Sequence, residues 1–324
     1  MSLEPGHTLS DVLSKMVLEG VLADLREFRC TCHLVSPVVR SDSGTRNFHI
    51  RDASIRFEEA GHRYIIYPGT VMEAVFPISV SGLWSQYFEE FDALAVIRRH
   101  YHTWAQRPSS AYYDIITESR AMGESDAEIA HRIRGMWSDL GALGSAQGTR
   151  MHRNIELALG GARYDASGPE MEMFRRFVTE WLEPKRWQVY RLEWSIYCTN
   201  AMVAGQIDAV FVARDGYHMV DWKRCRKPLD VSAGAYFERY GVYPFDDCLD
   251  NPCNHYFVQQ NLYAVLLERR YGIRLSSMWL VQIHPALESY MVIEVPDMRE
   301  RAAWILDRYG LGRDKTLPWE VLVA

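Results

Sequence analysis

The sequence predicts an α/β fold, with a mixed central β-sheet flanked by helices and preceded by an N-terminal mainly helical region. In the second half of the chain, helical and strand-like apolar patterns follow one another in the order α-β-β-β-α-β-β, which is typical of a sheet with helices on its faces. The composition supports a large core, because 48% of the residues are hydrophobic and the chain holds 10 Trp, 18 Tyr and 12 Phe. A length of 324 residues allows one large domain or two modest ones.

The charge and the terminal sequence restrict the class of protein. A net charge of −6 gives no global sign of nucleic-acid binding, so any such partner needs local basic clusters or a metal. No apolar run is long enough for a membrane span, and the N-terminus lacks the pattern of a secretory signal. Six cysteines in a chain of this length do not resemble a disulfide scaffold. We therefore expect no membrane and an intracellular, reducing compartment, either cytoplasm or nucleus, with an organelle left open; the oligomeric state stays unknown.

The N-terminal part starts with an amphipathic pattern that predicts a helix over Ser10–Phe28, because its apolar residues recur every three or four positions. Residues 36–54 are polar and rich in Ser and Asp, which predicts a loop. Alternating apolar residues then predict two strands around a turn at Glu58–Gly61, and a third strand after them. The expected strands are Ser54–Phe57, His62–Tyr67 and Thr70–Pro77.

From Ser81 the apolar pattern becomes helical. Pro108 interrupts it, because proline has no amide hydrogen to donate, and Ser125 before Asp126 is a typical helix start. Bases stack on aromatic side chains such as the many found here, but we expect most of these to pack a helical subdomain. The expected helices are Ser81–Phe88, Asp92–Ala105, Ser109–Met122 and one from Ser125 onward.

The second half begins with a helix over Gly148–Leu159, entered at Gly148-Thr149, and a helix over Pro169–Trp181 that Pro184 ends. Residues 228–253 read as irregular, with a short helix at Ala233–Tyr240. The remaining expected elements are the strands Gln188–Tyr197, Met202–Ala213 and Tyr217–Lys223, the helix His255–Tyr271, the strands Ser277–His284 and Tyr290–Val295, and the helix Met298–Tyr309.

These elements predict a division into three parts. Residues 1–145 form an N-terminal helical and β-hairpin region that is a candidate substrate lid. Residues 146–296 form the core, and residues 297–324 form a C-terminal helix and tail.

The hairpin of Met202–Pro228 carries the strongest chemical signal. Side chains in a strand alternate between faces, so Asp221 and Lys223 share one face while Trp222 points the other way. Asp208 precedes Asp221 by 13 positions, and a hairpin across that interval brings the two carboxylates together. Such a pair favours a bound Mg²⁺ or Mn²⁺, because hard cations take oxygen ligands. The lysine then either helps to deprotonate a water or offsets charge on a phosphate.

Two neighbouring segments add candidate ligands. His152 and Glu156 are four residues apart, so they lie on one face of the expected helix. Glu193 lies on the less apolar face of the first core strand, which directs it toward the same site.

Four elements in order, Gly148-x-x-x-His152, Gly205-x-x-Asp208, Asp221-x-Lys223 and Gln259-x-x-x-Tyr263, resemble the PD-(D/E)XK nuclease superfamily. The arrangement is most similar to its RecB-like branch, which includes the mitochondrial genome maintenance exonuclease and CRISPR-adaptation nucleases. The resemblance covers about residues 145–295 and implies a restriction-endonuclease-like core.

The resemblance implies specific roles. His152, Asp208, Asp221 and the backbone carbonyl of Trp222 match the metal ligands, and Lys223 matches the catalytic lysine. Gln259 and Tyr263 match a helical motif near the DNA backbone. Beyond the motif, Glu156 and Glu193 are candidates for a second metal or for a hydrogen bond to His152, and the number of metal ions stays open. Further candidate nucleic-acid contacts are Thr149, Arg224, Arg226 and Lys227.

The cysteines do not match the iron–sulfur cluster that some RecB-like nucleases carry. Cys30 and Cys32 come early and Cys248 and Cys253 precede the Gln259 helix, but no C-terminal triplet follows. We expect free thiols, with a zinc site on these four residues, or with His33 or His255 among the ligands, as the alternative.

These observations predict a metal-dependent DNA nuclease, an exonuclease on single-stranded ends. The alternatives are an RNA-cleaving or structure-specific endonuclease of the same fold, or a nucleic-acid-binding protein without catalysis.

Overall fold

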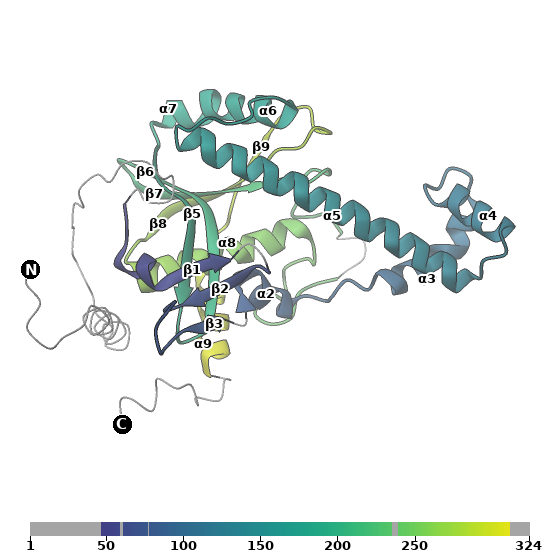
Figure 1. Cartoon of the computed structure of the whole chain (residues 1–324), viewed down its shortest axis with the longest axis horizontal. Helices are drawn as coiled ribbons and strands as arrows, with labels where there is room; N and C mark the ends of the chain where they lie inside the picture. The colour runs from purple at the N-terminus through teal and green to yellow at the C-terminus, as the bar shows by residue number, and fades with distance from the viewer. Residues whose placement is uncertain (1–46, 59–60, 77, 235–238, 312–324) are drawn as a thin grey trace, which may run out of the picture. The chain divides into compact units, whose positions relative to one another are not determined.

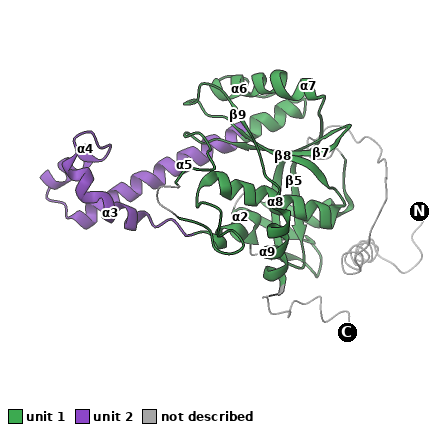
Figure 2. Cartoon of the chain, turned by 180° about the vertical axis from the view of Figure 1, so that it is seen from behind, with its two compact units in different colours: residues 1–88, 152–324 green, residues 89–151 purple. Residues whose placement is uncertain are grey.

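The computed structural model describes residues 47–58, 61–76, 78–234 and 239–311 (Figure 1). The predicted helix Ser10–Phe28, most of the predicted loop 36–54, and Cys30 and Cys32 lie outside these residues. The chain divides into two compact units, residues 1–88 with 152–324 and residues 89–151 (Figure 2). This division differs from the predicted one, because residues 50–88 belong to the larger unit together with the core.

The larger unit is built on a mixed sheet of six strands, which confirms the predicted α/β class. Strands β5 (Gln188–Cys198), β6 (Val203–Ala213) and β7 (Gly216–Lys223) are antiparallel neighbours, with β6 in the middle. The other members are β4 (Ile78–Ser79), parallel to β6, β8 (Leu275–Gln282), parallel to β7, and β9 (Met291–Glu294), antiparallel to β8.

Helices cover both faces of this sheet (Figure 1). Helix α8 (Pro252–Tyr271) begins after Asn251, whose side chain accepts from the amide of Asn254, and packs its apolar residues against β6, β7 and β8. α6 (Pro169–Phe177), a π-helical turn (Val178–Leu182) and α7 (Glu183–Lys185) lie on the opposite face. α9 (Arg299–Leu311) packs on α8. The Asn261 side chain of α8 accepts from the amide of Met298, just before α9.

A small antiparallel sheet precedes the core. It consists of β1 (Ile55–Glu58), β2 (Arg63–Ile66) and β3 (Ala74–Phe76), and it follows a 3-10 turn, η1 (Ile50–Ser54). Its apolar side chains pack against Tyr197 and Met202 at one end of the central sheet. The predicted strand pair is confirmed, and it forms part of the larger unit. Two short helical segments follow, α2 (Val80–Trp84) and η2 (Ser85–Tyr87).

The smaller unit is helical and has its own core. It contains α3 (Ala93–Gln106), α4 (Tyr113–Ala121) and residues 126–151 of α5 (Asp126–Leu159). The rings of Trp104, Tyr112 and Trp137 pack on one another, and the Trp137 indole donates to the Tyr112 hydroxyl at 2.9 Å. These contacts fit the prediction that the aromatic residues here pack a helical subdomain.

Two predicted elements need correction. Gly148 does not start a helix, because α5 runs without a break from Asp126 to Leu159. A helix interior tolerates a single glycine at a cost of about 1 kcal/mol relative to alanine, and helix-forming residues surround this one. The described residues of Ala233–Tyr240 form a turn and an isolated bridge rather than a helix. No helix within the described residues has the length and hydropathy that a bilayer crossing requires.

Candidate metal centre

The candidate site lies where one edge of β6 is left open. β6 pairs with β5 along one edge; along the other it pairs with β4 at Val203 and Ala204 and with β7 from Ala209 onward. Among the described residues, none pairs as a strand with residues 205–208 on that second edge. Asp208 lies at the end of this gap. The last strand pair here is Ala209–Val220, so the next position brings Asp208 opposite Asp221 on β7, as the hairpin pattern predicts.

Asp208 is fixed by two partners. Its Oδ2 accepts the Trp222 amide hydrogen at 2.8 Å and lies 3.4 Å from His152 Nδ1. Burial opposes ionisation of this carboxyl, but His152, Lys223 and the Trp222 amide outweigh burial and lower the pKa of Asp208. Asp208 is therefore an ionised carboxylate held in a set direction.

His152 and Glu193 complete a three-residue cluster with Asp208. One ligand atom from each residue lies within 4.8 Å of the others. Burial lowers the pKa of His152, but the Asp208 carboxylate outweighs burial and raises the pKa to about 9. Burial and the Asp208 charge raise the pKa of Glu193 to about 8. The pKa values of two of the three groups in the cluster are therefore raised.

Glu193 reaches this position through its place on β5 and an unusual backbone conformation. The pairs Leu192–Ala209 and Trp194–Ile207 flank it, so Glu193 faces Asp208 across the strands. Its φ is +44°, in the left-handed region that favours glycine and costs other residues about 1–3 kcal/mol. The Gln206 amide donates to the Glu193 carbonyl oxygen at 3.2 Å. A strained residue of this kind is typical of functional sites.

Asp221 and Lys223 form a buried ion pair beside the cluster. Lys223 Nζ lies 2.6 Å from Asp221 Oδ2, and the Gln260 amide donates to Asp221 Oδ1 at 2.9 Å. Burial raises the pKa of Asp221 to about 6, although Lys223 opposes this change. Lys223 also donates to Gln259 Oε1 at 3.3 Å and lies 4.2 Å from the centre of the Tyr256 ring. Asp221 is therefore held by Lys223 and Gln260, and it is not part of the three-residue cluster.

The side chain of Trp222 points to the opposite face, as the strand alternation predicts. It is buried against Phe174 and Phe177 of α6. Both rings meet the indole edge-to-face, with ring centres 5.7 and 5.5 Å from its own. Of Trp222, only the backbone therefore lies on the face of the sheet that carries Asp208.

Gln259 and Tyr263 lie one turn apart on α8, and Gln259 Nε2 donates to the Tyr263 hydroxyl at 3.3 Å. Tyr263 is 4% exposed and accepts from Gln259, whose Oε1 accepts from Lys223. Its predicted contact with nucleic acid stays a prediction. A Cβ on Gly205 would lie 2.6 Å from Tyr263 Cε1 and 3.0 Å from Val80 Cγ2. Glycine at this position therefore allows Tyr263 to fill the gap in the β6 edge.

Gly205→Ala is expected to lower the free energy of unfolding by about 1–3 kcal/mol, because the added methyl group overpacks the Tyr263 ring. Urea denaturation measures the change. Gly144→Ala is the matched control, since nothing lies within 4 Å of a Cβ at that helical position, and it should leave stability unchanged or raise it by up to about 1 kcal/mol. A Gly205→Ala protein as stable as wild type would contradict the close contact.

Three residues near the site were not anticipated from the sequence. Gln260 is fully buried and Tyr256 covers Lys223, but both are neighbours of the helical motif rather than members of it. Tyr64 comes from β2, and Glu193 and Asp208 add to burial in raising the pKa of its phenol. No sequence signal links Tyr64 to the site, because the contact joins segments more than a hundred residues apart.

The remaining predicted residues are placed differently. Glu156 lies outside the three-residue cluster and pairs with Arg153 at 2.5 Å, although its charge adds to the raised pKa of Glu193. The Thr149 hydroxyl belongs to the smaller unit and donates to the Ser145 carbonyl oxygen at 3.1 Å. Arg224 pairs with Glu170 at 3.0 Å, and its side chain is 10% exposed. Arg226 and Lys227 are exposed.

Cys248 and Cys253 are free and buried, and burial raises the pKa of both thiols to about 11. Within the described residues, the cluster of His152, Glu193 and Asp208 is the candidate metal-binding group; the described cysteines form none.

Comparisons with known proteins add little to this geometry. No family model matches the chain, and no curated protein matches it significantly. A solved structure described as "Crystal structure of SSO0001" is 12% identical and covers 55% of this chain and 92% of that chain, with a TM-score of 0.21. A likeness at that level carries no argument about fold or function.

Proposed function

We propose that this chain is a metal-dependent nuclease that hydrolyses phosphodiester bonds, acting as an exonuclease on single-stranded DNA ends. The observation that carries the proposal is the convergence of His152, Glu193 and Asp208, whose ligand atoms lie within 4.8 Å of one another. Carboxylate oxygens and an imidazole nitrogen are donors that Mn²⁺ accepts, and Mg²⁺ binds through such carboxylates. The donor set therefore fits either cation.

The residues around the cluster support this chemistry. A divalent cation supplies charge relief at a phosphate and lowers the pKa of a water. Asp208 is an oriented anionic ligand because the Trp222 amide fixes its Oδ2. Following the nuclease resemblance, we assign Asp221 and the Trp222 carbonyl as further ligands. Lys223 is held as an ammonium between Asp221 and Gln259, which favours the role in which it offsets charge on the phosphate.

Phosphate contacts away from the centre are assigned to Arg226 and Lys227. Both are exposed and come three and four residues after Lys223, so they supply positive charge near the end of β7. Contacts of this type are independent of sequence and sensitive to salt, and they allow a chain with a net charge of −6 to hold a polyanion. The role of residues 1–145 as a substrate lid stays a prediction.

The proposal is tested by digestion of end-labelled single-stranded DNA, circular single-stranded DNA and RNA of the same sequence, with Mg²⁺, Mn²⁺ or EDTA. We expect mononucleotides or short products from the linear DNA, and no digestion in EDTA.

Other outcomes separate the alternatives. Cleavage of the circular substrate would make the protein an endonuclease, and faster cleavage of RNA would change the substrate class. Binding to all three substrates without cleavage under any metal would overturn the catalytic proposal.

A further inference from the structure

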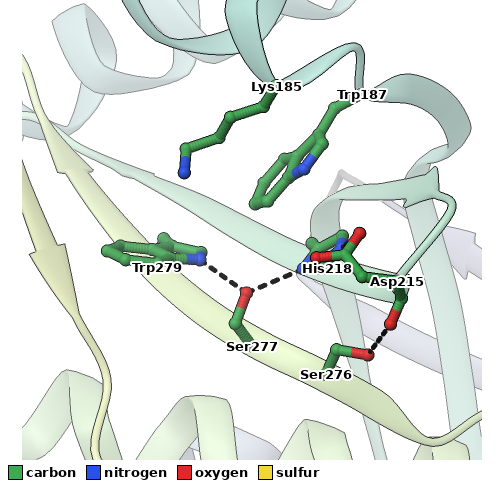
Figure 3. Close-up of a pocket in the computed structure, with 7 residues that line it drawn as sticks. All are labelled: Lys185, Trp187, Asp215, His218, Ser276, Ser277 and Trp279. Carbon is green, nitrogen blue, oxygen red and sulfur yellow. Dashed lines mark hydrogen bonds and ion pairs between the residues drawn. The ribbon is translucent and has the colours of Figure 1, made fainter.

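A second group of polar and aromatic side chains lies on the opposite face of the sheet. Asp221 and Lys223 point toward α8, whereas His218 lies on the same face of β7 as Trp222, under α6 and α7. At this point the structure has a cavity of about 430 Å³, lined by residues from the end of α7, the start of β5, the β6–β7 turn, β7 and β8 (Figure 3). None of the residues assigned to the candidate metal centre lines it.

One wall of the cavity presents hydrogen-bond acceptors. Trp279 Nε1 donates to Ser277 Oγ at 2.6 Å, and Ser277 Oγ lies 2.8 Å from His218 Nδ1. His218 Nε2 lies 3.1 Å from Asp215 Oδ1. Because an ionised carboxylate only accepts, the imidazole hydrogen on Nε2 faces Asp215 Oδ1. Ser277 Oγ therefore accepts from the Trp279 indole and is shared with His218.

Two neighbouring side chains, Ser276 and Asp215, present hydrogen-bond acceptors. The Ser276 hydroxyl donates to the Asp215 carbonyl oxygen at 2.7 Å, so its oxygen also faces solvent as an acceptor only. The Asp215 side chain is 71% exposed, and its second carboxylate oxygen is an acceptor. A ligand on this wall must therefore bring hydrogen-bond donors.

The facing wall presents aromatic surface and one cation. Trp187 stacks one face on His218, with ring centres 4.0 Å apart and planes at 12°. The Lys185 ammonium lies 4.6 Å from the ring centre of Trp181, 5.7 Å from that of Trp187 and 5.8 Å from that of Trp279. Figure 3 shows the Ser277 hydroxyl between Trp279 and His218, with Lys185 and Trp187 projecting toward them from the other side. Lys185 is exposed and is available to an anion.

We propose that this cavity is a nucleotide-binding site that prefers a base with an exocyclic amine. The planar base packs on the tryptophan rings, its amine donates to the Ser276 and Asp215 oxygens, and its phosphate pairs with Lys185. Aromatic side chains accept every base as a stacking partner, and the acceptor wall provides the selectivity. The same chemistry is offered by a free nucleotide and by a nucleotide within a single strand. The site requires no metal and no cleavage at Asp208, so it stands apart from the proposed nuclease function.

Binding of dAMP and dTMP to the full chain in EDTA, followed by tryptophan fluorescence and calorimetry, tests the proposal. We expect dAMP to bind about 10-fold more tightly than dTMP, because thymine lacks the exocyclic amine and offers the acceptors only its ring N3–H. The Asp208→Asn variant should bind dAMP as wild type does, which separates this site from the candidate metal centre.

Lys185→Gln tests the phosphate contact. It should weaken dAMP about 10-fold and leave deoxyadenosine unchanged, because only the nucleotide carries the anion. Arg269→Gln, which removes an exposed charge on α8 at the opposite face of the sheet, is the control and should change neither.

An octamer of thymidines with one central adenine separates the two sources of ligand. Binding of this octamer as tightly as dAMP assigns the site to a strand, and binding of dAMP alone assigns it to a free nucleotide. Equal affinity for dAMP and dTMP, no binding of either ligand, or a Lys185→Gln variant with unchanged affinity for dAMP would overturn the proposal.

Discussion

Asp208→Asn is expected to lower the rate of metal-dependent DNA cleavage by about 10³-fold or more, since the change removes the one ionised carboxylate of the three-residue cluster. The amide oxygen of asparagine still accepts the Trp222 amide hydrogen, so the fold should survive the change. Single-turnover cleavage of end-labelled DNA measures the rate, and circular dichroism checks the fold.

The matched control is Asp307→Asn, at an exposed carboxylate paired with Arg269 on the surface. It should leave the rate within about twofold of wild type, because exposed ion pairs contribute little. Lys223→Met is a less specific test of catalysis than Asp208→Asn, because it leaves Asp221 as a buried carboxylate without its ion-pair partner. Loss of activity in both aspartate variants, or in neither, would contradict the assignment of Asp208.

The central hairpin could be predicted because its information is local. Strand alternation places Asp221 and Lys223 on one face and Trp222 on the other, and the turn brings Asp208 opposite Asp221. Alternation also directed Glu193 to the same site, where it faces Asp208. These positions depend only on period-two geometry and short connections, which the sequence shows directly.

Other features depend on contacts between distant segments. The gap in the β6 edge exists because β4 and β7 pair with different ends of the same edge, and nothing in the β6 sequence shows where a partner ends. Tyr64 approaches the cluster from the small sheet, and no local pattern in the sequence predicts this contact either. These long-range contacts explain why the boundary at residue 145 differs from the observed units.

The local sequence pattern also could not predict which residue each charged side chain pairs with. Asp221 was expected among the metal ligands, but Gln260 and Lys223 hold its two oxygens in the metal-free chain. Arg224 was expected on a nucleic-acid surface, but Glu170 from α6 pairs with it. A basic run in a sequence shows how much charge is present, and only the fold decides which of those charges face solvent.

Metal affinity is expected to rise steeply with pH, because the pKa values of two of the three candidate ligands are raised. The pKa of His152 is raised to about 9, chiefly by the Asp208 carboxylate against the effect of burial. The pKa of Glu193 is raised to about 8 by burial and by Asp208. Both groups carry a proton at pH 7, and both must lose it to bind a metal. Asp208 is already ionised and contributes no proton.

Binding of Mn²⁺ at pH 7 should therefore release about two protons, and the number should fall as the pH rises through the pKa values of Glu193 and His152. The sign follows from the released protons: affinity increases with pH until both groups are deprotonated. Calorimetry in buffers of different ionisation enthalpy counts the protons directly.

His152→Gln should release about one proton fewer at pH 7, because the amide does not titrate. His131→Gln, at an exposed position on α5, is the control and should release as many protons as wild type. An affinity that does not change between pH 6 and pH 9 would place the metal away from His152 and Glu193. Because the two protons belong to two different residues, a loss of one in His152→Gln would identify His152 as a ligand even if the protein cleaves no DNA.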